Sequence, residues 1–122
     1  MERKKHILVA DDERLLRKLT ANMLSSAGFE VTTCASGAEA LKFYAKNQVD
    51  LVILDMIMPG LNGAETFRSL ISADPKAKVI ILSGFTRERV TKELYELGLA
   101  GFLDKPVSRV KLLRTVQEVL SS

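Results

Sequence analysis

Cysteine, tryptophan and long apolar runs are scarce in this sequence of 122 residues. It contains one cysteine, Cys34, and no tryptophan. A single cysteine excludes an internal disulfide and is typical of a reducing compartment, so we interpret Cys34 as a partly buried packing residue. No apolar run approaches the roughly 20 residues of a membrane-spanning helix, and the apolar stretch after His6 is too short for a signal peptide. These absences predict a cytoplasmic protein that does not enter a membrane.

The glycine-rich phosphate loops of nucleotide-binding proteins are also missing. Neither G-x-x-x-x-G-K-[ST] nor G-x-G-x-x-G occurs in the sequence, which argues against a nucleotide-binding α/β protein. The composition, 47% hydrophobic and 27% charged, is ordinary for a globular domain of this length. Because no repeat, linker or low-complexity stretch divides the sequence, we predict a single domain over residues 1–122.

The net charge of +3 raises the question of nucleic-acid binding. Residues 1–5 hold three basic residues and one acidic residue, which leaves 15 basic and 14 acidic residues elsewhere. Much of the excess positive charge therefore lies in the short basic N-terminal segment. No stretch of basic residues is interleaved with aromatic residues, as it is in proteins that bind single-stranded nucleic acids. We predict no direct nucleic-acid binding by this chain.

Five strand-length stretches alternate with five segments of helical periodicity. The expected strands are 7–10, 29–34, 50–54, 79–82 and 99–103. The third is apolar from Leu51 to Leu54 without polar alternation, which is typical of a strand covered on both faces. This alternation predicts an α/β fold, a parallel sheet with helices on both faces.

The expected helices carry recognisable ends and apolar faces. Ser36 and Ser108 are predicted N-caps, and Asn62 precedes the third helix. Gly28 and Gly98 are predicted to end the first and fourth helices. Residues at helical spacing predict the apolar faces of these two helices: Leu15, Leu16, Leu19, Met23 and Leu24 in the first, and Val90, Leu94 and Leu97 in the fourth.

The predicted strands deliver polar residues to one edge of the sheet, because parallel strands end together there. These residues are Asp11, Asp12, Asp55, Ser83 and Lys105. Three neighbouring carboxylates repel by roughly a few kcal/mol at an effective dielectric constant near 20, so we expect a divalent cation. A ligand set of oxygen atoms alone favours Mg²⁺ or Mn²⁺ over zinc. Lys105 and Ser83 suit phosphoryl oxygens, which leaves Asp55 as a nucleophile that forms an acyl phosphate.

With their neighbours, these residues resemble the signature of the response-regulator receiver domain, in the CheY-like superfamily, over essentially the whole chain. The motifs are Asp11-Asp12, Asp55 before Met58-Pro59-Gly60, Ser83-Gly84 and Lys105-Pro106. The resemblance implies a flavodoxin-like (βα)5 fold, doubly wound, with a five-stranded parallel sheet in the order 2-1-3-4-5. It also implies a phosphoprotein of a two-component regulatory system, which takes a phosphoryl group on Asp55 from a histidine kinase.

The resemblance further assigns the metal ligands. Asp12, the side chain of Asp55 and the backbone carbonyl of Ile57 are implied to hold Mg²⁺, with Asp11 helping directly or through water. The domain is then a switch that assists its own phosphotransfer and dephosphorylation, and not an enzyme.

The implied switch uses two further positions. Ser83 and Lys105 bind phosphoryl oxygens, and the Lys105–Pro106 bond is expected to be cis. Phosphorylation draws Ser83 toward Asp55 and lets Phe102 turn inward, which alters a surface made by the fourth helix, fifth strand and fifth helix.

Two positions depart from the more polar residues frequent in this family: Ile57, two after Asp55, and Phe85, two after Ser83. Our hypothesis is that both flank the acyl phosphate, hinder an attacking water and give a comparatively long-lived phosphorylated state.

Two other functions fit the sequence less well. A haloacid-dehalogenase-type phosphohydrolase requires a second Asp where Ile57 stands, and it usually has a cap domain. An interaction module that is never phosphorylated usually lacks some of the five site residues, all of which are present here.

The resemblance implies a histidine kinase or phosphotransfer protein as partner, docking near the first helix and the loop after the fifth strand. It also permits a homodimer through the fourth helix, fifth strand and fifth helix. A complete single-domain regulator and a piece of a longer protein both agree with the sequence.

Overall fold

A five-stranded parallel sheet with the strand order β2-β1-β3-β4-β5 forms the centre of the protein. The computed structural model describes residues 3–84 and 88–122. The strands are β1 (His6–Ala10), β2 (Glu30–Cys34), β3 (Leu51–Asp55), β4 (Val79–Ser83) and β5 (Gly101–Asp104). The helices are α1 (Arg14–Ser26), α2 (Gly37–Lys46), α3 (Gly63–Ala73), α4 (Glu88–Glu96) and α5 (Arg109–Leu120). The predicted flavodoxin-like fold and its strand order are confirmed.

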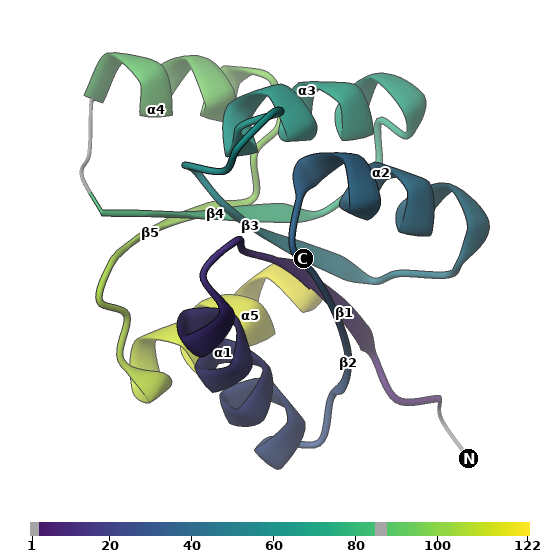
Figure 1. The fold of residues 1–122 in the computed structure, drawn as a ribbon, viewed down its shortest axis with the longest axis vertical. Coiled ribbons are helices and arrows are strands. Elements are labelled where there is room, and N and C mark those ends of the chain that lie inside the picture. The colour runs from purple at the N-terminus through teal and green to yellow at the C-terminus, as the bar shows by residue number, and fades with distance from the viewer. Residues whose placement is uncertain (1–2, 85–87) are drawn as a thin grey trace.

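Two helical layers cover the two faces of the sheet. α1 and α5 lie on one face and α2, α3 and α4 on the other (Figure 1). Along β3, Leu51 and Ile53 pack into the core beneath α1 and α5, while Val52 and Leu54 pack into the opposite core. Successive side chains of a strand point to opposite faces, so an unbroken apolar run fills both cores. This burial explains why the central strands show no polar alternation.

The helix ends follow the predicted capping residues. The side chain of Ser36 accepts a hydrogen bond from the backbone of Glu39, and Asn62 with Glu65 forms a capping box at the start of α3. Gly28 and Gly98 follow α1 and α4 with φ of +98° and +109°, a conformation that glycine adopts without a steric penalty. Within the described residues, no helix is both long and apolar enough to cross a membrane.

The fifth strand begins later than predicted. We expected residues 99–103, but β5 spans Gly101–Asp104. The backbone N–H of Leu99 bonds to the carbonyl of Leu94 and so completes the end of α4 instead of joining the sheet. β2 and β3 also differ from the prediction by one residue at their ends.

The predicted apolar face of α1 is only partly buried. Leu24 is buried and Leu16 and Met23 are half-buried, but Leu15 is 71% and Leu19 is 48% exposed. At 3.6 residues per turn, these two lie roughly 180° and 140° around the helix from Leu24. The apolar stripe is therefore wider than the face that touches the sheet. In the fourth helix region, Leu97 is likewise 48% exposed.

The carboxylate of Asp50 ties the start of β1 to the start of β3. It accepts hydrogen bonds from the backbone N–H of His6 at 2.7 Å and from the guanidinium of Arg3 at 3.1 Å. Burial alone would raise the pKa of Asp50, but the bond from His6 and the charge of Arg3 outweigh it and lower the pKa below 3.8. The ionised carboxylate therefore stabilises the folded state.

Asp50→Asn is expected to lower the free energy of unfolding by about 1 kcal/mol at neutral pH, the usual net value of a lost hydrogen bond. A group whose pKa is lowered by folding stabilises the protein above its unfolded value of 3.8. This contribution disappears as the pH falls through the lowered pKa of the folded state. Urea unfolding of both proteins at neutral and strongly acidic pH measures the difference. Glu30→Gln, on the exposed edge of β2, is the matched control, and an equal deficit of Asp50→Asn at both pH values would contradict the prediction.

Candidate functional site

Asp11 and Asp12 follow β1 directly, and Asp11 is held by several hydrogen bonds. Asp11 is buried and Asp12 is exposed. The N–H of Asp11 donates to the carbonyl of Cys34 at 3.1 Å, and its carboxylate Oδ1 accepts from the N–H of Glu13 at 2.9 Å. Arg17, in the first turns of α1, donates from Nη1 to the backbone carbonyl of Asp11 at 2.8 Å. The corner between β1 and α1 is therefore fixed through Asp11.

Asp55 ends β3 and lies against a lysine. It is 5% exposed, and its Oδ1 is 2.9 Å from Nζ of Lys105. The same ammonium lies 3.7 Å from Oδ2 of Asp11. The backbone N–H of Lys105 donates to the carbonyl of Ser83 at 2.7 Å, and the Lys105–Pro106 bond is cis, as predicted. One cation is therefore shared by the two buried carboxylates.

The electrostatics of the pair follow from burial and charge. Burial raises the pKa of Asp55 and the charge of Asp11 adds to this, while the hydrogen bond and charge of Lys105 oppose it without cancelling it. Burial alone would lower the pKa of Lys105, but the contact with Asp55 and the charge of Asp11 outweigh it and raise the pKa. The lysine therefore stays protonated beside a carboxylate that would otherwise be harder to ionise.

The carboxylates are close enough to share one cation. Asp11, Asp12 and Asp55 each offer an oxygen, and these oxygens lie within 4.8 Å of one another. Such a cluster of oxygen donors alone fits a hard divalent ion such as Mg²⁺. One ammonium beside two buried carboxylates and a third exposed one leaves an excess of negative charge that a cation would neutralise. The residues present therefore fit the expected metal.

The loop after β3 returns tightly against Asp55. The N–H of Gly63 donates to the carbonyl of Met56 at 2.8 Å. A Cβ at Gly63 would lie 2.5 Å from the carbonyl oxygen of Asp55 and 2.8 Å from Cα of Met56. Because both neighbours are backbone atoms, only glycine fits, and the start of α3 is seated directly on the backbone of the proposed phosphoacceptor.

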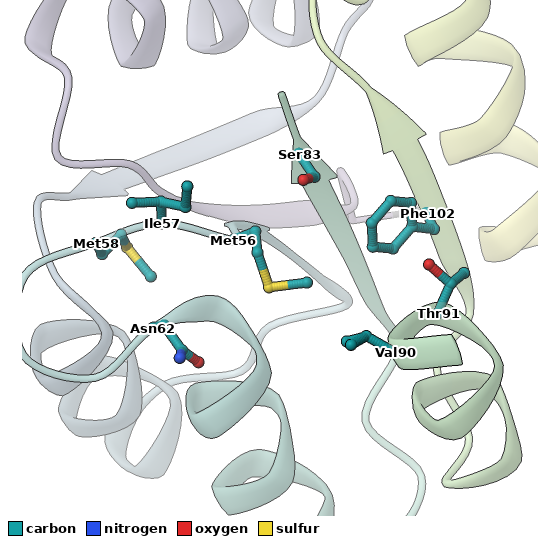
Figure 2. A pocket seen from close by; sticks show the side chains of 8 residues that line it. All are labelled: Met56, Ile57, Met58, Asn62, Ser83, Val90, Thr91 and Phe102. Atoms are coloured by element: carbon teal, nitrogen blue, oxygen red, sulfur yellow. The ribbon is translucent and has the colours of Figure 1, made fainter. Parts of the chain in front are cut away.

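A hollow of about 330 Å³ opens beside this edge of the sheet. Its lining residues are Met56, Ile57, Met58, Asn62, Ser83, Val90, Thr91 and Phe102. Ser83 is buried at the end of β4, and the half-buried ring of Phe102 projects from β5 into the hollow beside it (Figure 2). Ile57 is 58% exposed at its rim. The serine and aromatic positions predicted to act as a switch therefore share one cavity.

Most of the predicted site residues come together, with one outside the description. Asp11, Asp12, Asp55 and Lys105 form one cluster, and Ser83 is joined to it through the backbone of Lys105. Phe85 lies outside the residues that the structure describes. Cys34 is half-buried, as a packing residue would be. Burial also raises the pKa of its thiol to about 11, which disfavours the reactive thiolate.

Sequence reasoning missed Arg17. Its contact with Asp11 brings a side chain of α1 to the acidic corner. The one feature that could have predicted the contact is the position of Arg17, one turn after Glu13 on a helix that begins beside Asp11 and Asp12. That signal is weak, because exposed basic residues such as Arg14 and Lys18 stand on the same helix.

Comparison with known proteins agrees with this architecture. The family model described as response regulator receiver domain matches residues 7–117. Protein CcdB of Bacillus subtilis (strain 168) is 35% identical over 115 residues, which cover 93% of this chain and 96% of that protein. A CheY-like receiver domain protein from Methanospirillum hungatei JF-1 superposes with a TM-score of 0.92 at 25% identity, covering 98% of this chain and 95% of that one. Response regulator TrrA from Thermotoga maritima has a TM-score of 0.85 at 32% identity, covering 94% and 98%.

The matched region contains Asp11, Asp12 and Asp55 and all five strands except His6, the first residue of β1. Sequence, fold and relatives therefore agree, and the chain belongs to the response regulator receiver domain family of two-component signalling.

Proposed function

We propose that Asp55 is the phosphoacceptor of this receiver domain, within one phosphoacceptor unit over residues 1–122. The observation that carries the proposal is the buried Asp55 carboxylate, 2.9 Å from the Lys105 ammonium and clustered with Asp11 and Asp12. Receiver domains are signalling domains and generally not enzymes. The finer proposal is that this chain assists its own phosphotransfer and dephosphorylation.

The transfer exchanges one bond for another. A carboxylate oxygen of Asp55 attacks phosphorus, the bond from phosphorus to the histidine nitrogen of the donor breaks, and the nitrogen keeps that electron pair and takes up a proton. Lys105 and the hydroxyl of Ser83 bind phosphoryl oxygens as the group moves. The shared ammonium of Lys105 also favours the ionised form of Asp55 before the attack, because it opposes the rise in the pKa of Asp55.

Receiver domains bind Mg²⁺ at an acidic pocket. For this chain we propose Mg²⁺ or Mn²⁺, held by Asp12, the Asp55 side chain and the Ile57 carbonyl, with Asp11 directly or through water. When bound, the cation neutralises negative charge on the phosphoryl oxygens. The related TrrA was solved in complex with Mg²⁺ and BeF, which supports the assignment by analogy.

The phosphoacceptor assignment is tested by mass spectrometry after incubation with acetyl phosphate and Mg²⁺. We expect an added mass of one phosphoryl group that is removed by hydroxylamine, as for an acyl phosphate. Asp55→Asn should lose the adduct, while Asp104→Asn, at the exposed end of β5, should keep it. Absence of any adduct, or an adduct that survives Asp55→Asn, would refute the proposal and favour an interaction module that is never phosphorylated.

The switch that we propose uses the hollow that the loop after β3, Ser83, α4 and Phe102 enclose. Ser83 moves toward the phosphorylated Asp55, and the ring of Phe102 takes up space in the cavity that it already lines. The surface of α4, β5 and α5 then carries the signal. Exposed apolar residues on and beside these elements are Tyr95, Leu97 and Val110.

The same surface is our proposed dimer interface for the phosphorylated protein. Sedimentation with and without acetyl phosphate tests it, and an unchanged monomer mass would refute it.

We also propose the cytoplasm as the location of the protein, where a histidine kinase or phosphotransfer protein supplies the phosphoryl group. Fractionation of cells that express the chain tests this location.

The partner is proposed to dock on α1 and the loop after β5. Leu15 and Leu19 are exposed there, next to a hollow of about 400 Å³ whose lining includes Pro106 and Val107 and reaches Asp11. An apolar patch that borders the phosphorylation site suits a protein that must bring its phosphohistidine to Asp55.

Leu15→Glu is expected to slow phosphorylation by a histidine kinase about tenfold, because a charge replaces about 1.4 kcal/mol of apolar contact. Phosphorylation by acetyl phosphate, which needs no docking, should be unchanged. Val110→Glu, 66% exposed against 71% for Leu15 but on α5, is the control for the added charge. Equal slowing with both donors would contradict a docking role for Leu15.

A further inference from the structure

Among the described residues of α1, Arg17 has a side chain that donates a hydrogen bond to the acidic corner formed by Asp11 and Asp12. Its Nη1 donates to the backbone carbonyl of Asp11 at 2.8 Å, and the residue is half-buried. Its neighbours on the helix, Arg14 and Lys18, are exposed. The guanidinium of Arg17 therefore bonds to a backbone oxygen of the residue whose carboxylate belongs to the acidic cluster.

That backbone oxygen belongs to the peptide unit that joins Asp11 to Asp12. A peptide unit is planar and rotates as one body, so fixing its carbonyl restrains ψ of Asp11 and φ of Asp12 together. These two angles set where the Asp12 side chain leaves the backbone. Asp12 is exposed and precedes the first residue of α1, so neither core packing nor the helix ladder fixes it in this way.

Asp11 is held at its other polar atoms by different partners. Its N–H bonds to Cys34, its Oδ1 to the N–H of Glu13, and its Oδ2 faces Lys105. The carbonyl is thus the remaining polar group of Asp11, and Arg17 donates a hydrogen bond to it. The bond also links the corner to the first turn of α1, which the N–H of Arg17 closes by donating to the carbonyl of Glu13 at 2.9 Å.

We infer that Arg17 is a positioning residue for the cation site: it holds the Asp11–Asp12 peptide so that Asp12 faces Asp55 before the metal binds. The inference rests on the proposed function, because it presupposes that these carboxylates hold a divalent cation. It assigns to α1 a role in metal affinity beyond covering the sheet.

Positioning and simple electrostatics predict opposite signs. A guanidinium near a cation site repels the cation, so removal of the charge alone would tighten binding. Loss of the hydrogen bond instead frees the peptide and spreads Asp12 over several orientations, which weakens binding. Loss of a residue that orients a metal ligand typically costs ten- to a hundredfold in affinity.

The test is binding of Mn²⁺ alone to the unphosphorylated chain, followed by the electron paramagnetic resonance signal of free Mn²⁺. Arg17→Met keeps the apolar stem and should weaken binding about tenfold. Lys18→Met removes the same charge from the exposed face and should bind as the wild type does. Thermal unfolding of each variant confirms that the titrated protein is folded.

Binding by Arg17→Met that equals or exceeds wild-type affinity would overturn the inference. Where Arg17→Met does not fold, Arg17→Lys decides: it keeps the charge on a shorter stem, so severalfold weaker binding supports positioning and unchanged binding overturns it. Asp12→Asn distinguishes failure of the cation site from failure of the role of Arg17. If the wild type does not bind Mn²⁺, or if Asp12→Asn binds it equally well, the cation site is refuted and the role of Arg17 with it. If binding requires Asp12 but not Arg17, only the role of Arg17 is refuted.

Discussion

Lys105→Met is expected to slow phosphorylation of Asp55 by acetyl phosphate about a hundredfold, the cost of losing one donor to a developing oxyanion. Two effects of the lysine act together. In the proposed transfer its ammonium stabilises the phosphoryl oxygens, and in the structure it opposes the burial and the charge of Asp11 that raise the pKa of Asp55. Without it the pKa of Asp55 rises further, and a smaller fraction of the protein carries the ionised nucleophile.

The two effects are separable by pH. A loss that comes from protonation of Asp55 shrinks as the pH rises, whereas the loss of phosphoryl stabilisation persists. Phosphorylation rates from a series of pH values, obtained by mass spectrometry, measure both. Lys111→Met, on the exposed side of α5, is the matched control for a lost lysine. A rate for Lys105→Met within a factor of about two of wild type would mean that neither effect operates, since each donor of this kind is worth far more.

The fold was predictable because its strands carry a strong and local signal. The runs around Leu8, Leu54 and Ile81 are apolar without alternation, and each is followed by a polar residue. Such strands need covering on both faces, which only helices on both sides of a parallel sheet provide. The carboxyl ends of parallel strands then meet at one edge, so the clustering of Asp11, Asp55 and Lys105 followed from the topology.

The sequence did not show which face of a helix meets the sheet, nor which side chains bond to backbone groups. Leu15 and Leu19 share the helical spacing of Leu24, yet only Leu24 is buried, because spacing gives a stripe and not the angle at which the helix meets the sheet. The sequence did not distinguish Arg17 from the other basic residues of α1. Its partner is a backbone carbonyl, which every residue has. The start of β5 was misplaced for a similar reason, because the N–H of Leu99 serves α4.

Ile57 has a place in the structure that suits control of the phosphate lifetime. It stands two residues after Asp55, half-exposed at the rim of the hollow that contains Ser83 and Phe102 (Figure 2). Hydrolysis of an acyl phosphate requires a water that approaches phosphorus in line with the bond to Asp55. We propose that the branched apolar side chain of Ile57 offers that water no hydrogen bond and hinders its approach.

Ile57→Asn is therefore expected to speed dephosphorylation about tenfold, because one hydrogen bond to the attacking water lowers the barrier by about 1.4 kcal/mol. The decay of the phosphorylated protein after removal of acetyl phosphate measures the rate. Ile57→Val, which keeps a branched apolar side chain, should decay like the wild type. Phe85→Glu, predicted from sequence to act in the same way, is measured beside it. Unchanged decay in both Ile57→Asn and Phe85→Glu would contradict the hypothesis. A polar side chain at either position would then give the attacking water no advantage, and groups other than these two would set the lifetime.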